Sequence, residues 1–293
     1  MSDPILRTEK LTKDYGRVRA LEGMDLSVPA GEIFGLLGPN GSGKSTAIRL
    51  ILGFLRPTAG AAWVQGFHCW TQPVEVKRRL TYLPGELRLY ENMTGRQLVS
   101  FLARLRGEPV DGDVDRLAKR FDIDLSRALV QLSSGMKRKV ALLAVLAPRV
   151  PFVILDEPTN ALDPAMREEL LGLLREAKNR GQTVMFSSHV LSEVEAVCDR
   201  VGILQRGRLV HVETMESLRR ERVVWARLAA PLDCWPVVPG AKPMTELGRE
   251  IAFEQSGPPG PLFAWLGTQA VEEIRVEPTG LHPVYLKYHG NGA

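Results

Sequence analysis

The stretch G-P-N-G-S-G-K-S-T, from Gly38 to Thr46, decides the fold, because its spacing G-x-x-x-x-G-K-[ST] is that of a phosphate-binding loop. Gly41 and Gly43 allow a tight turn that aims successive N–H groups inward. Lys44 supplies a cation, and Ser45 offers a hydroxyl to Mg²⁺. We therefore expect the loop to bind a nucleoside triphosphate, through Gly38, Pro39, Asn40, Gly41, Ser42, Gly43, Lys44, Ser45 and Thr46.

The segments on either side of this loop favour the same interpretation. The apolar run Ile33–Leu37 before the loop predicts a buried strand, and residues 46–52 after it have helical spacing. A strand, a glycine-rich loop and a helix in this order place bound phosphates at a helix N-terminus, where unpaired N–H groups and the helix dipole favour anions.

The composition is that of an ordinary globular protein with room for two domains. The chain has 293 residues, 44% hydrophobic and 25% charged, with 38 Lys+Arg against 34 Asp+Glu. The formal charge of +4 is too mild to indicate nucleic-acid binding, and no basic stripe accompanies it. Cys69, Cys198 and Cys234 form no close pair, so we expect buried thiols in a reducing compartment rather than a disulfide framework or zinc site.

The sequence contains neither a recognisable export signal at its N-terminus nor an apolar stretch long enough to span a membrane. The N-terminal residues lack the charged and apolar regions of a secretory signal. The apolar stretch Val140–Ala147 ends at Pro148, well short of the roughly 20 residues that span a bilayer. Any membrane role is therefore expected to need a separate membrane-spanning partner.

Alternation of short apolar runs with helical stretches predicts an α/β fold with a largely parallel sheet over residues 1–214. The glycine-flanked segment Gly60–Gln65 indicates an antiparallel β flank. Between residues 91 and 149 the pattern becomes helical, with Leu98, Phe101, Leu102 and Leu105 at helical spacing, which predicts a helical insert. Further strands are expected at Phe152–Leu155 and Thr183–Ser187, with a helix between them whose apolar face is Met166, Leu170, Leu173 and Leu174.

Residues 215–293 differ in composition and predict a small C-terminal α/β (α+β) domain. Prolines and glycines become frequent, as in Gly257–Gly260, while Val223–Leu228 and Ile274–Val276 have strand-like patterns. We expect its three tryptophans to lie in the core, namely Trp225, Trp235 and Trp265.

An acidic pair follows the strand predicted at Phe152–Leu155, in the sequence F-V-I-L-D-E-P. Because the carboxyl end of a parallel strand lies beside a phosphate loop in such folds, Asp156 is predicted to reach Mg²⁺. The next residue, Glu157, is then placed to polarise a water. The combination predicts hydrolysis of the bound nucleotide.

With these motifs the chain resembles the nucleotide-binding subunits of ATP-binding cassette (ABC) transporters, whose fold is the P-loop NTPase fold of ABC ATPase type. Leu132–Met136 resembles the family signature L-S-G-G-Q, with Gly135 kept but Ser134 and Met136 departing from it. Serine-x-glycine-methionine followed by basic residues, here Lys137–Lys139, is familiar in the branches that export drugs and polysaccharides. Ser133 and the N–H groups that open the following helix still offer donors to a γ-phosphate.

The resemblance extends over residues 5–215 and implies roles for further residues. Asn160–Asp163 matches the D-loop, His189 the switch histidine, and Tyr15 the aromatic residue that stacks on adenine. The implied catalytic residues are Glu157, His189 and Lys44; the implied ATP contacts outside the phosphate loop are Tyr15, Ser133, Ser134, Gly135 and Asp163; the implied Mg²⁺ ligands are Ser45, Asp156 and Glu86. The segment Glu277–Tyr288 also resembles the closing motif of many exporter ATPase subunits.

One loop departs from the family. Aligning Leu89–Thr94 on the family pattern places Gly85 where a glutamine normally touches Mg²⁺ and faces the membrane partner. Glycine has no side chain to offer a metal, so either Glu86 swings in, a water substitutes, or coupling relies on other groups.

The resemblance implies an ATPase that powers an exporter, peripheral on the cytoplasmic face of the membrane through a separate polytopic permease. Two subunits meet head to tail, each ATP lying between one chain's phosphate loop and the other chain's signature, as a homodimer or with a related subunit. Closure would follow ATP binding and reopening would follow hydrolysis. The alternative is an ABC ATPase that acts on ribosomes or DNA; such proteins generally carry two cassettes or a coiled-coil or zinc-hook insert, which this sequence lacks, so no nucleic-acid partner is expected.

Overall fold

The structure, a computed structural model, describes residues 4–107, 112–220, 222–232, 234–245, 248–278 and 280–289. Residues 108–111 of the predicted helical insert and Thr279 of the closing motif lie outside this part of the chain. The chain divides into two compact units, Met1–Val212 and Glu213–Ala293.

A six-stranded sheet forms the centre of the first unit, in the order β10-β9-β3-β8-β7-β6. The pairs β9–β3, β3–β8, β8–β7 and β7–β6 are all parallel, as the alternating pattern predicted. The strands are β3 (Ile33–Leu37), β6 (Leu80–Leu83), β7 (Phe152–Asp156), β8 (Thr183–Ser188), β9 (Arg200–Gln205) and β10 (Arg208–Thr214). Every residue of β3, β7 and β8 is buried, which is why these strands are continuous apolar runs.

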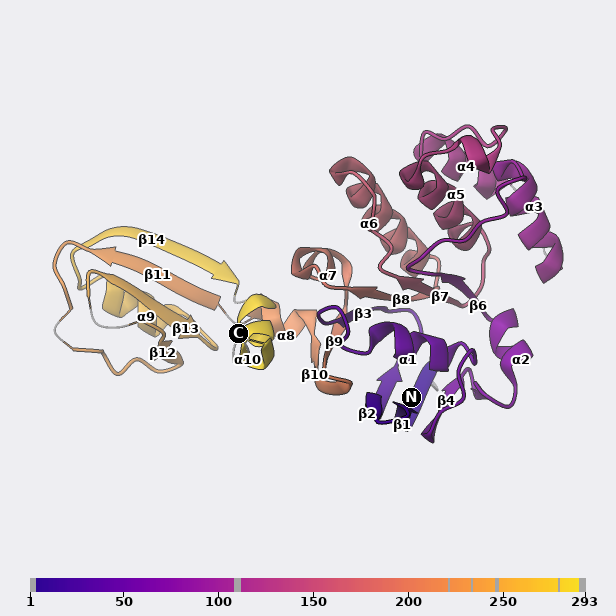
Figure 1. Ribbon diagram of the computed structural model, residues 1–293. Coiled ribbons are helices and arrows are strands. Elements are labelled where there is room, and N and C mark those ends of the chain that lie inside the picture. The colour runs from indigo at the N-terminus through magenta and orange to yellow at the C-terminus, as the bar shows by residue number, and fades with distance from the viewer. Residues whose placement is uncertain are drawn as a thin grey trace. The chain divides into compact units, whose positions relative to one another are not determined.

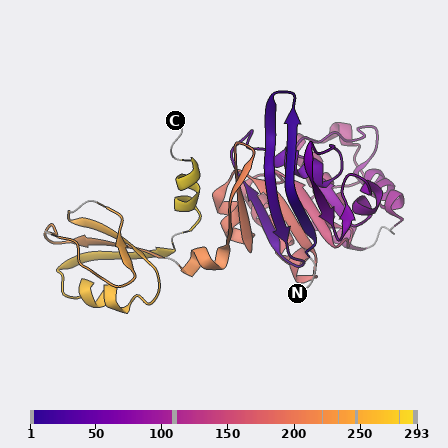
Figure 2. The ribbon, with the colours of Figure 1, turned by 90° about the horizontal axis from the view of Figure 1, so that it is seen from below.

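The predicted antiparallel flank is confirmed as a four-stranded sheet in the order β2-β1-β4-β5. Figure 2 shows β1 and β2 as a long hairpin at one side of this unit. The strands are β1 (Leu6–Tyr15), β2 (Val18–Val28), β4 (Ala59–Val64) and β5 (Phe67–His68). One apolar core joins Leu6 and Met24 of this flank to Ile48 of α1 and Phe152 of the central sheet. Helix α1 (Lys44–Ile51) is therefore held between the two sheets (Figure 1).

Other helices cover the central sheet and connect its strands. They are α2 (Pro73–Arg78), α6 (Pro164–Asn179) and α7 (Leu191–Val197). The four apolar residues predicted to line one face of α6 are all buried, Met166, Leu170, Leu173 and Leu174. Helix α7 approaches β3 so closely that a Cβ at Gly35 would lie 2.8 Å from the Cys198 sulfur and 3.0 Å from Val194.

The predicted helical insert is confirmed within the described residues (Figure 1). It contains α3 (Gly95–Arg106), α4 (Gly112–Arg120), the 3₁₀ turn Leu129–Gln131, and α5 (Ser134–Leu146). Helix α3 begins at a capping box, in which the Thr94 hydroxyl accepts from the Gln97 N–H and the Gln97 amide oxygen accepts from the Thr94 N–H. Leu98 is buried on this helix, whereas Leu105 is 68% exposed. None of the helices described is long and apolar enough to cross a bilayer.

The second unit is a small α+β fold around an antiparallel sheet in the order β12-β13-β11-β14. Its elements are α8 (Met215–Arg220), β11 (Arg222–Leu228), β12 (Ala241–Pro243), β13 (Glu250–Gln255), α9 (Gly260–Leu266), β14 (Val271–Pro278) and α10 (His282–His289). Leu262 and Leu266 of α9 pack against Val224 and Phe253 of the sheet, forming a core separate from that of the first unit. Strands were predicted at both β11 and β14.

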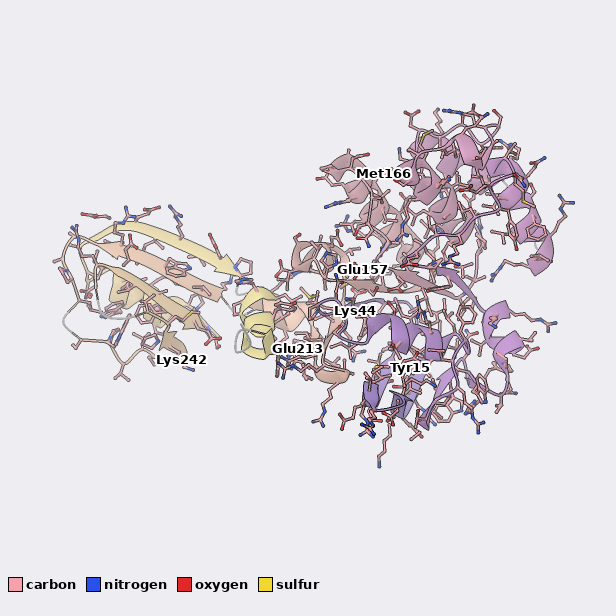
Figure 3. All side chains as sticks on the ribbon, viewed as in Figure 1. Tyr15, Lys44, Glu157, Met166, Glu213 and Lys242 are labelled. Atoms are coloured by element: carbon pink, nitrogen blue, oxygen red, sulfur yellow. The ribbon has the colours of Figure 1, made fainter. Side chains whose placement is uncertain are left out.

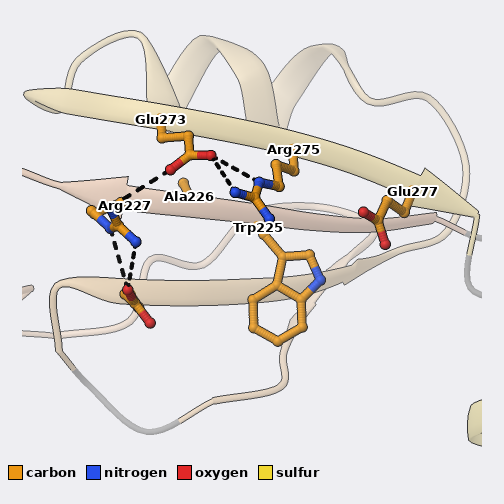
Figure 4. Close-up of a pocket in the computed structure, with 7 residues that line it drawn as sticks. Trp225, Ala226, Arg227, Glu273, Arg275 and Glu277 are labelled. Atoms are coloured by element: carbon orange, nitrogen blue, oxygen red, sulfur yellow. Dashed lines mark hydrogen bonds and ion pairs between the residues drawn. The ribbon is translucent and has the colours of Figure 1, made fainter.

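Two expectations about burial are wrong. Trp235 and Trp265 pack against the second core, but Trp225 is 42% exposed. Alternation along β11 turns Val224 and Ala226 toward α9 and leaves Trp225 on the opposite face of the sheet, beside Arg227. Figure 4 shows this face, where Arg227 pairs with Glu250 and Glu273, and Arg275 also pairs with Glu273.

The second error concerns the cysteines. All three are free, and Cys69 and Cys198 are buried as expected, but Cys234 is exposed in a loop of the second unit. Burial raises the pKa of Cys69 to about 12 and that of Cys198 well above its usual value, so these two thiols stay protonated at neutral pH.

Candidate functional site

The phosphate-binding loop connects β3 to α1, and its geometry fits a bound polyphosphate. Gly41 and Gly43 have φ angles of 79° and 108°, in the left-handed region that glycine adopts without strain. Gly43 is the N-cap of α1 and offers no side-chain cap, so the N–H groups of the first helical turn remain available to an anion. A Cβ at Gly38 would lie 2.5 Å from the Leu204 carbonyl oxygen, which restricts this position to glycine.

The remaining loop residues divide between the surface and the interior. Pro39, Asn40 and Gly41 are exposed, whereas Ser45 and Thr46 are half-buried. The Ser42 hydroxyl is buried without a hydrogen-bond partner among the described residues. A buried polar atom of this kind beside uncapped N–H groups fits a ligand oxygen at the loop.

Lys44 is buried and joins the phosphate loop to the end of β7. Its Nζ donates to the carbonyl oxygens of Gly38, at 2.7 Å, and Pro39, at 3.2 Å. The same Nζ lies 3.2 Å from Glu157 Oε1. The structure thus brings together a lysine and a glutamate that stand more than 100 positions apart in the sequence, as Figure 3 shows.

Asp156 and Glu157 are held at the carboxyl end of β7 by Ser187 of β8. The Ser187 hydroxyl donates to Asp156 Oδ1 at 2.6 Å and accepts from the Glu157 N–H at 2.9 Å. Glu157 has a φ of 47°, a left-handed conformation that costs a non-glycine residue about 1–2 kcal/mol. Its side chain is therefore aimed by a backbone conformation that its neighbours maintain.

His189, which follows β8, contacts the second carboxylate oxygen of Glu157. Nδ1 of the ring lies 2.8 Å from Glu157 Oε2. Since Lys44 contacts Oε1, the Glu157 carboxylate lies between the lysine ammonium and an imidazole that can also carry a proton. The three predicted catalytic residues form one cluster, although each comes from a different segment of the chain.

The loop after β6 brings Gly85 next to Asp156. A Cβ at Gly85 would lie 3.5 Å from Asp156 Oδ2, an ordinary van der Waals contact, so a larger side chain here would begin directly beside the carboxylate. Glu86 is exposed. Burial, followed by the charge of Asp156, raises the pKa of Tyr82 on β6 to about 12. Asp156 and the Ser45 hydroxyl are oxygen donors of the kind that Mg²⁺ prefers, and the site fits this ion.

The signature and D-loop residues lie at the starts of other helices. Ser133 caps α5 by accepting from the Met136 N–H at 3.3 Å, and Ser134 is the first residue of that helix. A Cβ at Gly135 would lie 3.1 Å from the carbonyl oxygen of Ala161 in the D-loop. Asp163 caps α6 by accepting from the Met166 N–H at 2.9 Å.

The other predicted nucleotide contacts come from elements outside the Lys44 cluster. Tyr15, at the end of β1, is 47% exposed, and the ammonium of Lys13 lies 5.2 Å from its ring centre. Helix α1, which follows the phosphate loop, and helix α5, which follows the signature, lie on opposite sides of β7 and β8 in Figure 1.

Sequence reasoning missed two residues that hold the site. Ser187 was included in a strand, but its hydroxyl connects the acidic pair to β8. Arg138 was grouped with two neighbouring basic residues, yet it is only 3% exposed. The signal was its helical position, because Arg138 stands three and four residues before Ala141 and Leu142, which are buried.

Comparisons with known proteins agree with this geometry. The model of the family described as ABC transporter matches residues 21–160. The ABC transporter ATP-binding protein NatA of Bacillus subtilis is 34% identical over 207 residues, covering 69% of this chain and 84% of NatA. The daunorubicin/doxorubicin resistance ATP-binding protein DrrA of Streptomyces peucetius is 33% identical over 219 residues, covering 73% of this chain and 66% of DrrA.

Among solved structures, the ATP-binding subunit of an ABC transporter is similar over 74% of this chain and 92% of its own length. The TM-score is 0.68 and the sequence identity is 32%. Both the phosphate loop and the Asp156–Glu157 pair lie within the region matched by the family. The chain therefore belongs to the family of ABC transporter ATP-binding proteins.

Proposed function

We propose that this chain hydrolyses ATP as the motor subunit of an exporter, with Glu157 as the general base. The observation that carries the proposal is the Glu157 carboxylate, which lies 3.2 Å from Lys44 and 2.8 Å from His189 at the edge of the phosphate loop. A carboxylate so placed can accept the proton of a water that attacks the γ-phosphate, giving ADP and inorganic phosphate.

The other residues of the cluster support this step. Lys44 provides the positive charge that offsets the charge of the phosphates, and His189 can orient Glu157 or exchange a proton with it. The Ser187 hydroxyl holds Asp156 and Glu157 in place through one hydrogen bond to each residue. Ser45 and Asp156 would hold Mg²⁺, which, when bound, neutralises phosphate charge; Glu86 as a further ligand stays a prediction.

A dimer would bring together the phosphate loop and the signature, which lie apart within one chain. The signature Leu132–Met136 begins α5, whereas the phosphate loop begins α1 across the sheet. Head-to-tail pairing would let Ser133, Ser134 and Gly135 of one subunit approach the ATP held by the other, with Tyr15 stacked on adenine and Asp163 near the interface. A homodimer and a pair with a related subunit both satisfy this arrangement.

The membrane partner is proposed to be a separate permease, with this chain on its cytoplasmic face. NatA and DrrA are named as ATP-binding proteins of a transporter and of drug resistance, which supports export. A groove of about 990 Å³ between α2, β6, α3 and α5 offers a place for the partner. Its rim has Val74 and Leu105, 61% and 68% exposed, beside Lys77 and Arg104, a combination that suits an amphipathic segment with acidic residues.

The alternative function, an ATPase acting on ribosomes or DNA, is not favoured by the comparisons. The relatives named above are transport or resistance proteins. The formal charge of +4 is also small for a nucleic-acid machine.

Two measurements on the full chain test the proposal. Lys44→Ala is expected to abolish tight ATP binding and hydrolysis, whereas the control Lys119→Ala, at an exposed position of α4, leaves both unchanged. A purified wild-type chain that fails to hydrolyse ATP with Mg²⁺ present would refute the enzymatic assignment. Purification from a detergent extract should bring down a polytopic membrane protein, whereas recovery of ribosomes or DNA instead would overturn the transport assignment.

A further inference from the structure

Arg138 occupies an unusual position in the first unit, because it is a buried cation with no carboxylate side chain of the described residues in hydrogen-bond contact. It lies in the second turn of α5 and is 3% exposed. All five of its N–H donors meet main-chain carbonyl oxygens: Gly85 at 2.9 Å, Pro84 at 3.1 Å, Asp156 and Pro158 at 3.2 Å, and Glu157. Five donors in a planar fork are what arginine alone provides.

These bonds join three segments that are distant in the sequence. Arg138 belongs to the helix that begins at the signature. Two of its acceptors lie in the loop after β6, at Pro84 and Gly85, and the other three follow one another at the end of β7. Since residue 85 has no side chain, the contact between this loop and α5 is made through its main-chain carbonyl.

The contact with Glu157 is the most consequential of the five. The Glu157 N–H donates to Ser187 and the Glu157 carbonyl accepts from Arg138, so both sides of this residue are held. Its φ of 47° is a conformation that a glutamate keeps only when its surroundings impose it. A displacement of α5 would therefore change the orientation of the Glu157 carboxylate.

We propose that Arg138 is a positioning residue that couples the signature helix to the Glu157 carboxylate of the same chain. The inference rests on the proposed function, in which α5 of one subunit meets the ATP held by the other. ATP on one subunit then fixes α5 of its partner, Arg138 transmits that position, and the partner's own site becomes competent. The two sites hydrolyse cooperatively because each guanidinium connects one site to the other.

The test compares Arg138→Gln and Arg138→Lys with the control Lys139→Gln in the full chain. Lys139 is on the same helix and also bonds one carbonyl oxygen, that of Phe121 at 2.9 Å, but it makes no contact with β7 in the described residues. Lysine at 138 keeps the charge with three donors instead of five, so it remains informative if the glutamine variant does not fold. Steady-state hydrolysis is measured against ATP concentration, with ATP binding and the melting temperature measured in parallel.

Both Arg138 variants should bind ATP within about 2-fold of wild type, because none of the five bonds reaches the phosphate loop. Their kcat should fall about 10-fold or more, through misplacement of Glu157. Their Hill coefficient should fall from near 2, the number of sites, toward about 1, while Lys139→Gln keeps the wild-type value.

Three results would overturn the inference: a wild-type Hill coefficient of 1, Arg138 variants that keep the wild-type coefficient, or the same loss of cooperativity in Lys139→Gln. A wild-type chain without ATPase activity would instead refute the proposed function itself, so the two failures are distinguishable.

Discussion

Replacing Glu157 by glutamine or by aspartate separates the basicity of this residue from its geometry. Glutamine has the length of glutamate, so its amide oxygen can stay 3.2 Å from Lys44 while its NH₂ faces the nitrogen of His189, which accepts in one neutral tautomer. It cannot accept the proton of water. Aspartate keeps the basic group but withdraws it by about 1.5 Å, which breaks both contacts.

The expected magnitudes follow from these differences. Loss of a general base reduces the rate about 10²- to 10⁴-fold, which is a barrier increase of about 3–5 kcal/mol. Glu157→Gln should therefore bind ATP but hydrolyse it slowly, and the ATP-bound dimer should accumulate. Glu157→Asp should also lose activity, by about 10²-fold for a displacement of this size, but without accumulation of the dimer, because the carboxylate no longer supports the closed arrangement through Lys44 and His189.

The assay is single-turnover hydrolysis of radiolabelled ATP, combined with size-exclusion chromatography in ATP and Mg²⁺. Binding is measured separately, so that a loss of affinity is not mistaken for a loss of chemistry. A Glu157→Gln chain that turns over within about 5-fold of wild type would contradict the role of general base, since that role predicts at least about 10²-fold.

Further predictions concern the metal site, the helical insert and the thiols. In Gly85→Gln, the new Cβ fits 3.5 Å from Asp156 Oδ2, and the variant should need less Mg²⁺ than wild type for half-maximal hydrolysis. Gly85→Ala, which adds only the Cβ, should not lower this concentration. The same Mg²⁺ dependence of hydrolysis in both variants would show that an amide at this position does not reach the metal. The hydrogen bond from Arg120 lowers the pKa of Glu176, so the stabilisation by this pair is present above the unfolded pKa of about 4.5 and is lost as the pH falls through the lower folded value. Arg120→Gln should therefore lower the melting temperature at pH 7 and make the melting temperature decline less steeply in acid. Parallel plots of melting temperature against pH for the variant and wild type would contradict this. Cys234 should be the one thiol that reacts rapidly with a disulfide reagent in the folded chain, with all three reacting in denaturant, and fast reaction of two or more in the folded chain would contradict the described burial.

Spacing and order of motifs predicted much of this arrangement, for a physical reason. A phosphate loop after one parallel strand and two carboxylates after another are brought to the same edge of the sheet whatever lies between them. Lys44 and Glu157 consequently meet at 3.2 Å. The roles assigned to the site residues and the domain boundary at residue 214 stay predictions.

The errors arose where burial depends on what packs on a given face. Trp225 has the composition of a core residue, but α9 covers the other face of its sheet, so the side chain remains exposed. Cys234 is a small apolar residue, but its side chain is exposed, although the adjacent Trp235 packs against the second core. The prediction for Arg138 was wrong in the opposite sense: a charged side chain is normally solvated, and the burial of this one is favourable only because five carbonyl oxygens converge on it from two other segments.

The left-handed backbone of Glu157 also limits which amino acids the position accepts, independently of chemistry. At a φ of 47°, asparagine, aspartate and glycine are conformationally favoured over glutamate, and β-branched residues are excluded. In a saturation library, selection for a folded chain would therefore enrich asparagine and glycine at this codon, while selection for turnover would remove them. Selection for folding and selection for ATP turnover therefore favour different amino acids at position 157.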